Sequence, residues 1–338
     1  MILRLPRSVL LSACAAAALL LGIIAIGVGP VPLDVRAVLG ALFGDVDDAT
    51  TAIVLSIRLP RVALALLVGG GLAIAGATMQ GLFRNPLADP GLIGVSSGAA
   101  LAAVTVIVLG DGLFGGMAGR FALPIAAFAG SLGTTWFVYR LARFCGRTHI
   151  ATMLLAGIAI NALCGAVIGV LVYVANDDQL RSLTFWQMGS LGRAGWPEVW
   201  MCLAIMLPAM IWLLTLGRSL NALVLGDSEA QYLGIDVQRC TRTAIILCAL
   251  LVGAGVAVSG VIGFIGLVIP HLIRLLIGPD HRGVLPGAAC AGGALLVAAD
   301  MGARTAAAPA ELPVGLLTAA IGAPFFLVLL LQQRRGAV

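Results

Sequence analysis

Long apolar runs, separated by short polar segments, repeat along the whole chain. Most of these runs match the roughly 20 residues that an α-helix needs to cross the hydrocarbon core of a bilayer. The pattern therefore predicts about ten transmembrane helices. We expect them at 8–29, 58–82, 92–110, 121–144, 149–174, 198–217, 241–260, 262–278, 284–303 and 313–333. The run at 262–278 is short and contains Pro270, which predicts a broken or tilted helix.

Composition supports a membrane protein without a soluble module. Of the 338 residues, 61% are hydrophobic and only 10% are charged, whereas soluble domains carry about 25% charged residues. Outer-membrane barrels show short alternating strands instead of long apolar runs. We therefore expect an all-α, polytopic membrane protein that forms a single domain over residues 1–338.

Arginine placement predicts the orientation, because cytoplasmic segments of membrane proteins are enriched in basic residues. With the N-terminus inside, the inner segments hold 13 arginines: Arg4, Arg7, Arg84, Arg140, Arg143, Arg147, Arg218, Arg239, Arg242, Arg274, Arg282, Arg334 and Arg335. The outer segments hold 7: Arg36, Arg58, Arg61, Arg120, Arg181, Arg193 and Arg304. Both termini are therefore expected in the cytoplasm.

Several enzyme chemistries are excluded or disfavoured by the residues present. The chain has no Lys, so it cannot form a Walker A loop or a Schiff base; any ATP hydrolysis must occur in another chain. The "GVSSG" at 94–98 fits G-x-S-x-G but lacks a preceding strand. An intramembrane serine protease that pairs Ser96 or Ser97 with His271 is the remaining enzyme alternative. Three histidines without clustered partners predict no metal site.

Ion coupling is also disfavoured. A proton-driven carrier usually has ionisable residues deep in its spans, whereas Asp300 and Glu311 lie at the outer ends of the last two spans. A sodium site made of backbone carbonyls stays open as an alternative.

Two apolar segments share the pattern LLVGxGxAxxG. They are "LLVGGGLAIAG" at 66–76 and "LLVGAGVAVSG" at 250–260. In the expected topology they run in opposite directions, as in an inverted repeat, although chance matches are common in apolar sequence. Their small residues, spaced four apart, are typical of close helix packing in lipid.

Two polar segments on the inner side interrupt the apolar pattern. "RNPLADPG" at 84–91 contains two prolines and therefore predicts a turn between two helices. In the longer segment 217–242, Gly226 or Asp227 can cap a short helix at 228–233 that Gly234 ends. The apolar residues of this segment predict a docking site for a cytoplasmic partner, with a helix lying along the membrane interface as the alternative.

The motifs of the chain closely resemble those of one transporter family. The segments "RLPRVALALLVGGGLAIAGATMQGLFRNPLADPGLIGVSSGAA", "LNALVLGDSEAQYLGIDV", "GFIGLVIPHLIRLLIGPDHR" and "ADMGARTAAAPAELPVGLLTAAIGAPFF" occur in order between about residues 50 and 333. They resemble FecCD/BtuC-like permease subunits of type II ATP-binding-cassette (ABC) importers for ferric siderophores, haem and vitamin B12. A secondary carrier is the rival class.

The resemblance implies the fold, the partners and the sites. It implies a BtuC-like homodimer in the bacterial inner membrane, with two cytoplasmic ATPases that bind ATP and Mg, and a periplasmic binding protein. No cofactor, catalytic residue or nucleic acid is expected for this chain. The coupling loop, about 219–238, would contact the ATPase through Leu223, Leu225, Gly226, Glu229, Ala230, Leu233 and Gly234. Arg58, Arg61 and Arg304 would be exposed at the outer face and dock the binding protein. Arg84, Asn85, Pro86, Asp89 and Pro90 would form the cytoplasmic turn.

The cargo is the least determined property. The segment "TFWQMGSLGRAGW" at 184–196 resembles haem permeases more than cobalamin permeases. We therefore expect haem, with a ferric siderophore or cobalamin as alternatives. The fifth span with its outer extension, about 149–190, would line the path together with the tenth.

Overall fold

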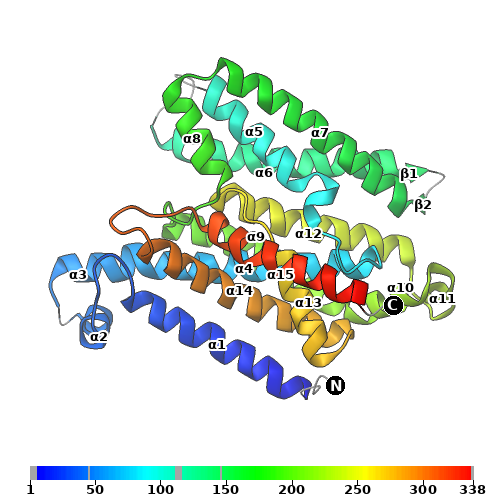
Figure 1. Ribbon diagram of the computed structural model, residues 1–338, viewed down its shortest axis with the longest axis horizontal. Helices are drawn as coiled ribbons and strands as arrows, with labels where there is room; N and C mark the ends of the chain where they lie inside the picture. Colours follow the sequence, from blue (N-terminus) through cyan, green and yellow to red (C-terminus); the bar gives the residue numbers. More distant parts are fainter. Residues whose placement is uncertain (1–5, 45, 111–115, 145–146, 336–338) are drawn as a thin grey trace.

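The computed structural model describes residues 6–44, 46–110, 116–144 and 147–335, so that Arg4 lies outside the described residues. It is a helical bundle with one two-residue strand pair (Figure 1). The helices are α1 (Arg7–Gly27), α2 (Val35–Phe43), α3 (Asp48–Ala52), the π-helix η1 (Ile53–Arg58), α4 (Leu59–Leu82), the 3-10 helix η2 (Pro90–Ile93), α5 (Val95–Leu109), α6 (Gly116–Ala142), α7 (Ile150–Val174), α8 (Asp177–Gln187), α9 (Trp196–Thr215), α10 (Gly217–Leu225), α11 (Asp227–Tyr232), α12 (Val237–Ser259), α13 (Ile265–Ile277), α14 (His281–Thr305) and α15 (Val314–Arg335). The strands are β1 (Arg143–Phe144) and β2 (Arg147–Thr148).

The expected set of apolar helices is confirmed. In the described part of the chain, 7 helical segments are long and apolar enough to cross a membrane, and the shorter apolar helices are Val95–Leu109, Ile265–Ile277 and Val314–Val328. Together they correspond one to one with the ten runs read from the sequence. The second run begins earlier than expected, because α3, η1 and α4 form one continuous helix over Asp48–Leu82.

The bundle has two ends, which we call inner and outer. At the inner end, α1 begins, α15 ends, and β1–β2, α10 and α11 lie close together; α2, α3 and α8 lie at the outer end (Figure 1). Every segment at the inner end is one that the arginine distribution assigns to the cytoplasm. The arrangement is therefore consistent with the topology expected from the sequence.

Helix α4 forms the centre of the bundle and is buried along almost its whole length. It packs against α14, α12, α13 and α9, and glycines allow the closest approaches. A Cβ atom on Gly76 would lie 1.8 Å from the Gly266 carbonyl oxygen, and one on Gly69 would lie 2.4 Å from that of Gly292. Small residues at such crossings let backbones touch, which is how helices associate without a hydrophobic driving force in lipid.

The two copies of the LLVGxGxAxxG pattern pack against each other on α4 and α12. Cys248 donates to the Ala75 carbonyl at 3.6 Å, while a Cβ atom on Gly255 would lie 3.4 Å from Val68. As the residue number rises on one helix it falls on the other, so the two copies are antiparallel. Their expected opposite directions are confirmed.

Replacing Gly76 by Ala should destabilise the bundle, because α4 and α13 must separate to admit the new methyl group. Overpacking of this kind costs about 1–3 kcal/mol. Gly133 on α6 is the matched control, since a Cβ atom there meets nothing within 4 Å. Thermal unfolding in detergent should show a lower midpoint for Gly76→Ala and an unchanged or higher midpoint for Gly133→Ala. Equal midpoints would contradict the close crossing.

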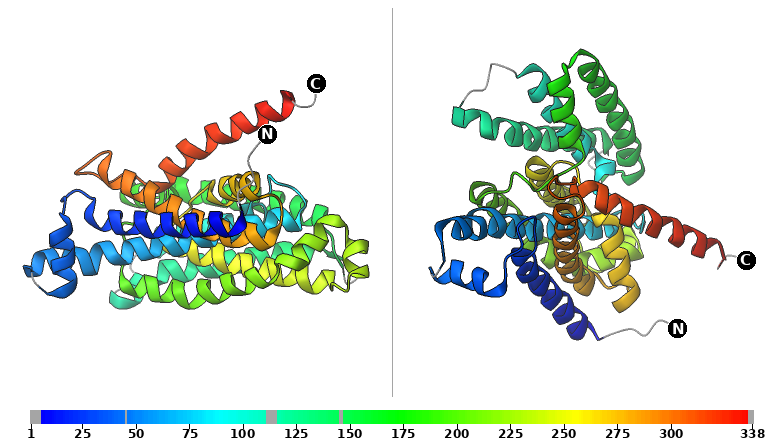
Figure 2. Two further views of the ribbon diagram at one scale, coloured as in Figure 1. Left: turned by 90° about the horizontal axis from the view of Figure 1, so that it is seen from below. Right: turned by 60° about the vertical axis from the view of Figure 1, so that its left-hand side comes forward.

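Helices α7 and α15 lie at the periphery and on one side of the molecule (Figure 2, right). In the described part of the chain, the more extensive contacts of α15 are with α13 and α14. Large apolar side chains of α7 are exposed, including Leu155, Leu163 and Val170. In a membrane this surface meets lipid or another chain.

Candidate functional site

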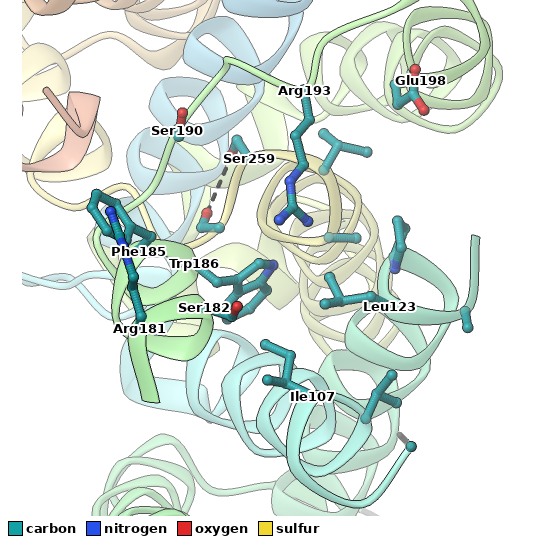
Figure 3. Close-up of a pocket in the computed structure, with 17 residues that line it drawn as sticks. Ile107, Leu123, Arg181, Ser182, Phe185, Trp186, Ser190, Arg193, Glu198 and Ser259 are labelled. Carbon is teal, nitrogen blue, oxygen red and sulfur yellow. Dashed lines mark hydrogen bonds between the residues drawn. The ribbon is translucent and has the colours of Figure 1, made fainter. Parts of the chain in front are cut away.

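A cavity of about 790 Å³ opens at the outer end of the bundle (Figure 3). It lies between α5, α6, α8, the loop that leads into α9, and the end of α12. Its lining residues are Val106, Ile107, Gly110, Ala122, Leu123, Pro124, Arg181, Ser182, Phe185, Trp186, Ser190, Arg193, Glu198, Ala257, Val258, Ser259 and Gly260. Four of these fall within the segment 184–196, which the sequence singles out for cargo.

The cavity combines aromatic and cationic groups. The Arg193 side chain points into it from the loop, and Trp186 reaches in from α8 (Figure 3). The Arg181 guanidinium lies over the Phe185 ring, 5.9 Å from the ring centroid. In the described part of the chain neither arginine forms an ion pair. Arginine stacks on aromatic rings and binds carboxylates with two parallel hydrogen bonds, so the arrangement suits a flat, apolar molecule that carries negative groups.

Local sequence explains how this wall of the cavity is built. Asn176 and Gln179 form a capping box that starts α8, a signal that our reading of the sequence missed. After α8 ends, Gly189 adopts a φ of +71°, and Gly260, with a φ of +68°, lies against it. The Ser190 amide donates to the Ser259 carbonyl at 2.7 Å. Two glycine turns thus clamp the loop of α8 onto the end of α12.

The expected turn at 84–91 is confirmed and lies at the inner end. Asp89 accepts a hydrogen bond from the Gly91 amide at 2.7 Å and caps the short helix η2, which begins at Pro90. Burial raises the pKa of Asp89 above its usual range, although that hydrogen bond opposes the shift. Asn85 accepts from the Leu87 amide at 2.9 Å, while Pro86 is exposed.

Arg84 joins this turn to the expected coupling loop. Its Nε donates to the Leu223 carbonyl at 2.6 Å, and its guanidinium pairs with Asp227. Arg84 also has a φ of +50°, which is uncommon for a residue other than glycine. A long-range contact between the two inner segments therefore holds the start of α11 in place.

The segment expected to be the coupling loop contains the expected short helix as α11. It is preceded by α10, which we did not predict. Gly226 caps α11 and Gly234 follows it with a φ of +82°. The most exposed large apolar side chains of this segment are Tyr232 at 92%, Leu225 at 67% and Leu233 at 62%. They form a surface that we call the inner apolar patch.

Two of the residues expected to contact the ATPase face the protein interior instead. Leu223 is 2% exposed and Ala230 is 0% exposed, because each lies on the inward side of its amphipathic helix. These two side chains are therefore not available for the expected ATPase contact in this structure, while a contact through the rest of the segment stays a prediction. Glu229 folds back toward Gly226, since a Cβ atom on Gly226 would lie 1.9 Å from a Glu229 carboxylate oxygen.

The expectation of exposed arginines at the outer face is also wrong. Arg58, Arg61 and Arg304 are 4%, 6% and 3% exposed. Arg58 donates to the carbonyls of Ile26 and Gly27 at 2.6 and 2.8 Å, which caps the end of α1. It satisfies carbonyl groups that the helix end leaves free.

Arg61 and Arg304 belong to a buried ionic cluster. Arg61 binds Asp300 at 2.9 Å and Glu311 at 2.9 Å. The Arg304 Nε lies 3.1 Å from Asp300 but lacks hydrogen-bond geometry, and its guanidinium donates to the Ala25 carbonyl at 3.2 Å. The cluster ties α1, α4, α14 and the loop before α15 together. Docking of a binding protein by these arginines stays an untested prediction.

A second polar cluster lies at the inner end, and we did not predict it from the sequence. Asp280 accepts from the Asn221 amide at 2.8 Å and pairs with Arg7. Burial raises the pKa of Asp280. Hydrogen bonds from Asn221, the Arg282 amide and Arg7 lower it, as does the positive charge of Arg7. These effects outweigh burial, so the pKa of Asp280 lies below its usual value. The signal was the charged run "GPDHR" between two apolar spans.

The residues of the protease alternative have other contacts. Ser97 donates to the Gly94 carbonyl at 3.1 Å and to Asn161 at 2.5 Å. His271 lies edge-on to Phe325, with the ring centroids 6.3 Å apart. Among the described residues no hydrogen bond joins Ser97 to His271, and no group of three or more His, Cys, Asp or Glu side chains could hold a metal.

Comparison with known proteins decides the family. The model of the FecCD transport family matches residues 17–332, which is most of the chain. The chain belongs to the FecCD transport family. A hemin transport system permease, HmuU of Yersinia pestis, is 54% identical over 85% of this chain and 86% of its own length. The cobalamin import permease BtuC of Halobacterium salinarum is 44% identical over 87% of this chain and 77% of its own length.

A solved structure supports the same assignment for the fold. An inward-facing metal-chelate type ABC transporter superposes with a TM-score of 0.85 at 32% identity, covering 95% of this chain and 98% of that one. The fold of this FecCD-family protein is therefore that of an ABC permease, as the resemblance implied.

Proposed function

We propose that this FecCD-family protein is the permease subunit of an ATP-driven importer that carries haem from the periplasm to the cytoplasm. The observation that carries the proposal is the 54% identity to a hemin transport permease over 288 residues. Similarity at this level covers 85% of the chain and is higher than the 44% identity to a cobalamin permease.

The outer cavity supports haem as the cargo. Haem is a flat aromatic molecule with two carboxylates, and the cavity presents Phe185 and Trp186 beside Arg181 and Arg193. In a partly desolvated site, hydrogen bonds from arginine to a carboxylate are about twice as strong as neutral ones. The arginines would hold the carboxylates while the aromatic rings contact the porphyrin.

The same proposal assigns the partners. The permease works as a homodimer in the bacterial inner membrane, with both termini in the cytoplasm. Two ATPase subunits, which bind ATP and Mg, dock on the inner apolar patch, and a periplasmic binding protein docks at the outer end. The absence of Lys supports this division of labour, because the chain has no Walker A lysine of its own.

Cobalamin is the second candidate cargo because permeases for it are 44% identical to this chain. A ferric siderophore is the third. The pair of arginines beside aromatic rings fits a porphyrin with two carboxylates better than it fits cobalamin or a ferric siderophore.

The test is stimulation of ATP hydrolysis by the loaded binding protein in liposomes. A haem-loaded binding protein should stimulate the complete complex, and the double variant Arg181→Gln/Arg193→Gln should need about tenfold more to reach half-maximal stimulation or lose most of it. Arg36→Gln, an exposed outer arginine on α2, is the matched control and should behave as wild type. Stimulation only by a siderophore-loaded or cobalamin-loaded binding protein would overturn the haem assignment and leave the family assignment intact.

A further inference from the structure

A second hollow lies between α6 and α12, near the inner end. It has a volume of about 300 Å³, and two stripes of side chains at helical spacing face each other across it. The stripe on α6 and the residue after it comprises Leu132, Thr135, Trp136, Tyr139, Arg140 and Arg143, and that on α12 comprises Arg242, Ile245, Ile246 and Ala249. We call it the basic groove.

The charged and apolar parts of the basic groove are separated along the helix axes. Arg140, Arg143 and Arg242 are exposed at its mouth, where α6 ends and α12 begins. Leu132 and Ala249 lie farthest from the mouth along the two helices, and α6 rises by about 15 Å from Leu132 to its end at Ala142. Thr135 is already satisfied by the Ser131 carbonyl at 2.8 Å, so the floor offers apolar surface.

The three arginines carry no ion pair in the described part of the chain. Arg140 lies over the Trp136 ring, 5.7 Å from its centroid. The nearest carboxylate along α12 is Asp236, which is occupied in capping the helix through the Arg239 amide at 2.9 Å. Three positive charges therefore line the mouth of the groove, and none of them has a negative partner among the described residues.

We propose that the basic groove binds an anionic phospholipid. The headgroup phosphate is held by Arg140, Arg143 and Arg242, and an acyl chain lies along the apolar floor. Basic pockets between transmembrane helices on the cytoplasmic side recognise anionic headgroups in this way. The aromatic ring of Trp136 stands between the two regions, at the level where aromatic residues border the membrane.

The surroundings favour a lipid over a soluble anion. Trp136 and Ile246 are 62% and 47% exposed, and both helices belong to the apolar set that crosses the membrane. A soluble phosphate would contact the arginines and leave the floor exposed. The assignment to the cytoplasmic leaflet rests on the proposed orientation, whereas the lipid chemistry is independent of the cargo.

The test is native mass spectrometry of the purified permease titrated with phosphatidylglycerol. We expect one tightly bound lipid per subunit, and an affinity lower by roughly 100-fold in the triple variant Arg140→Gln/Arg143→Gln/Arg242→Gln, since each arginine contributes several-fold. The matched control removes the same charge from arginines outside the groove: Arg218→Gln/Arg239→Gln/Arg282→Gln should stay within about twofold of wild type. Phosphatidylcholine should not displace the bound lipid.

A second variant keeps the test informative if the triple variant folds poorly. Ile246→Trp fills the floor but retains all three charges, and it should also weaken phosphatidylglycerol binding. Equal affinity in wild type, Ile246→Trp and the triple variant would overturn the proposal. Displacement of the lipid by millimolar inorganic phosphate would overturn it too, because the site would then recognise a free anion.

Discussion

Leu225→Glu and Leu233→Glu are each expected to release the ATPase during purification while the permease stays folded. Both side chains are more than 60% exposed at the inner end, so a charge there costs little in the free permease. In a complex the same charge would be buried in an apolar contact. Central interface residues are worth about 2 kcal/mol or more on truncation, and a buried unpaired charge costs more.

The measurement is co-purification of the ATPase with the tagged permease. Val35→Glu is the matched control, because Val35 is 74% exposed but lies on α2 at the outer end. It should retain the ATPase fully. Retention of the ATPase with normal transport in the Leu225 and Leu233 variants would favour the alternative, in which α10 and α11 lie along the membrane interface.

Asp300→Asn is expected to produce the largest loss of stability among single substitutions of charged residues. Asp300 is 1% exposed and neutralises Arg61, with Arg304 beside it. Removing one partner of a buried ion pair typically costs about 3–5 kcal/mol, because the remaining charge is left without compensation. Here two buried guanidinium groups would share Glu311 alone.

The second substitution Arg304→Met should recover much of this loss, since it removes the surplus charge and keeps an apolar side chain of similar length. Asp48→Asn is the control: Asp48 is an exposed carboxylate at the same end. Thermal midpoints and yields in detergent measure the effect. A wild-type midpoint for Asp300→Asn would show that the cluster contributes little.

The helices and their order could be predicted because membrane crossing requires long apolar runs, and such runs are visible in one sequence. The turn at 84–91 could be predicted for a similar reason, since its prolines act on the local backbone. The opposite directions of α4 and α12 could be predicted because they are the second and the seventh expected spans, and successive spans alternate in direction.

The burial of Arg61 could not be predicted from its own neighbourhood, because its partner Asp300 lies 239 residues away in the chain. A weaker signal was present. Asp300 and Glu311 were already placed at the same outer end as Arg58, Arg61 and Arg304, and opposite charges gathered at one apolar end favour pairing.

The inward direction of Leu223 had a local signal that was not used. Residues 217–225 form the amphipathic helix α10, on which Leu220 and Leu223 share the buried side and Leu225 is exposed. Residues two apart on a helix point about 200° apart. We expected only one short helix in this segment, so the opposite directions of Leu223 and Leu225 were not predicted.

Haem accumulation in sealed vesicles tests the central claim most directly. The permease is reconstituted with its ATPase and binding protein, haem is supplied on the side of the binding protein, and haem inside the vesicles is measured with and without ATP. We expect accumulation that requires ATP, both partner proteins and Mg. Accumulation driven by a proton or sodium gradient without the ATPase would contradict it.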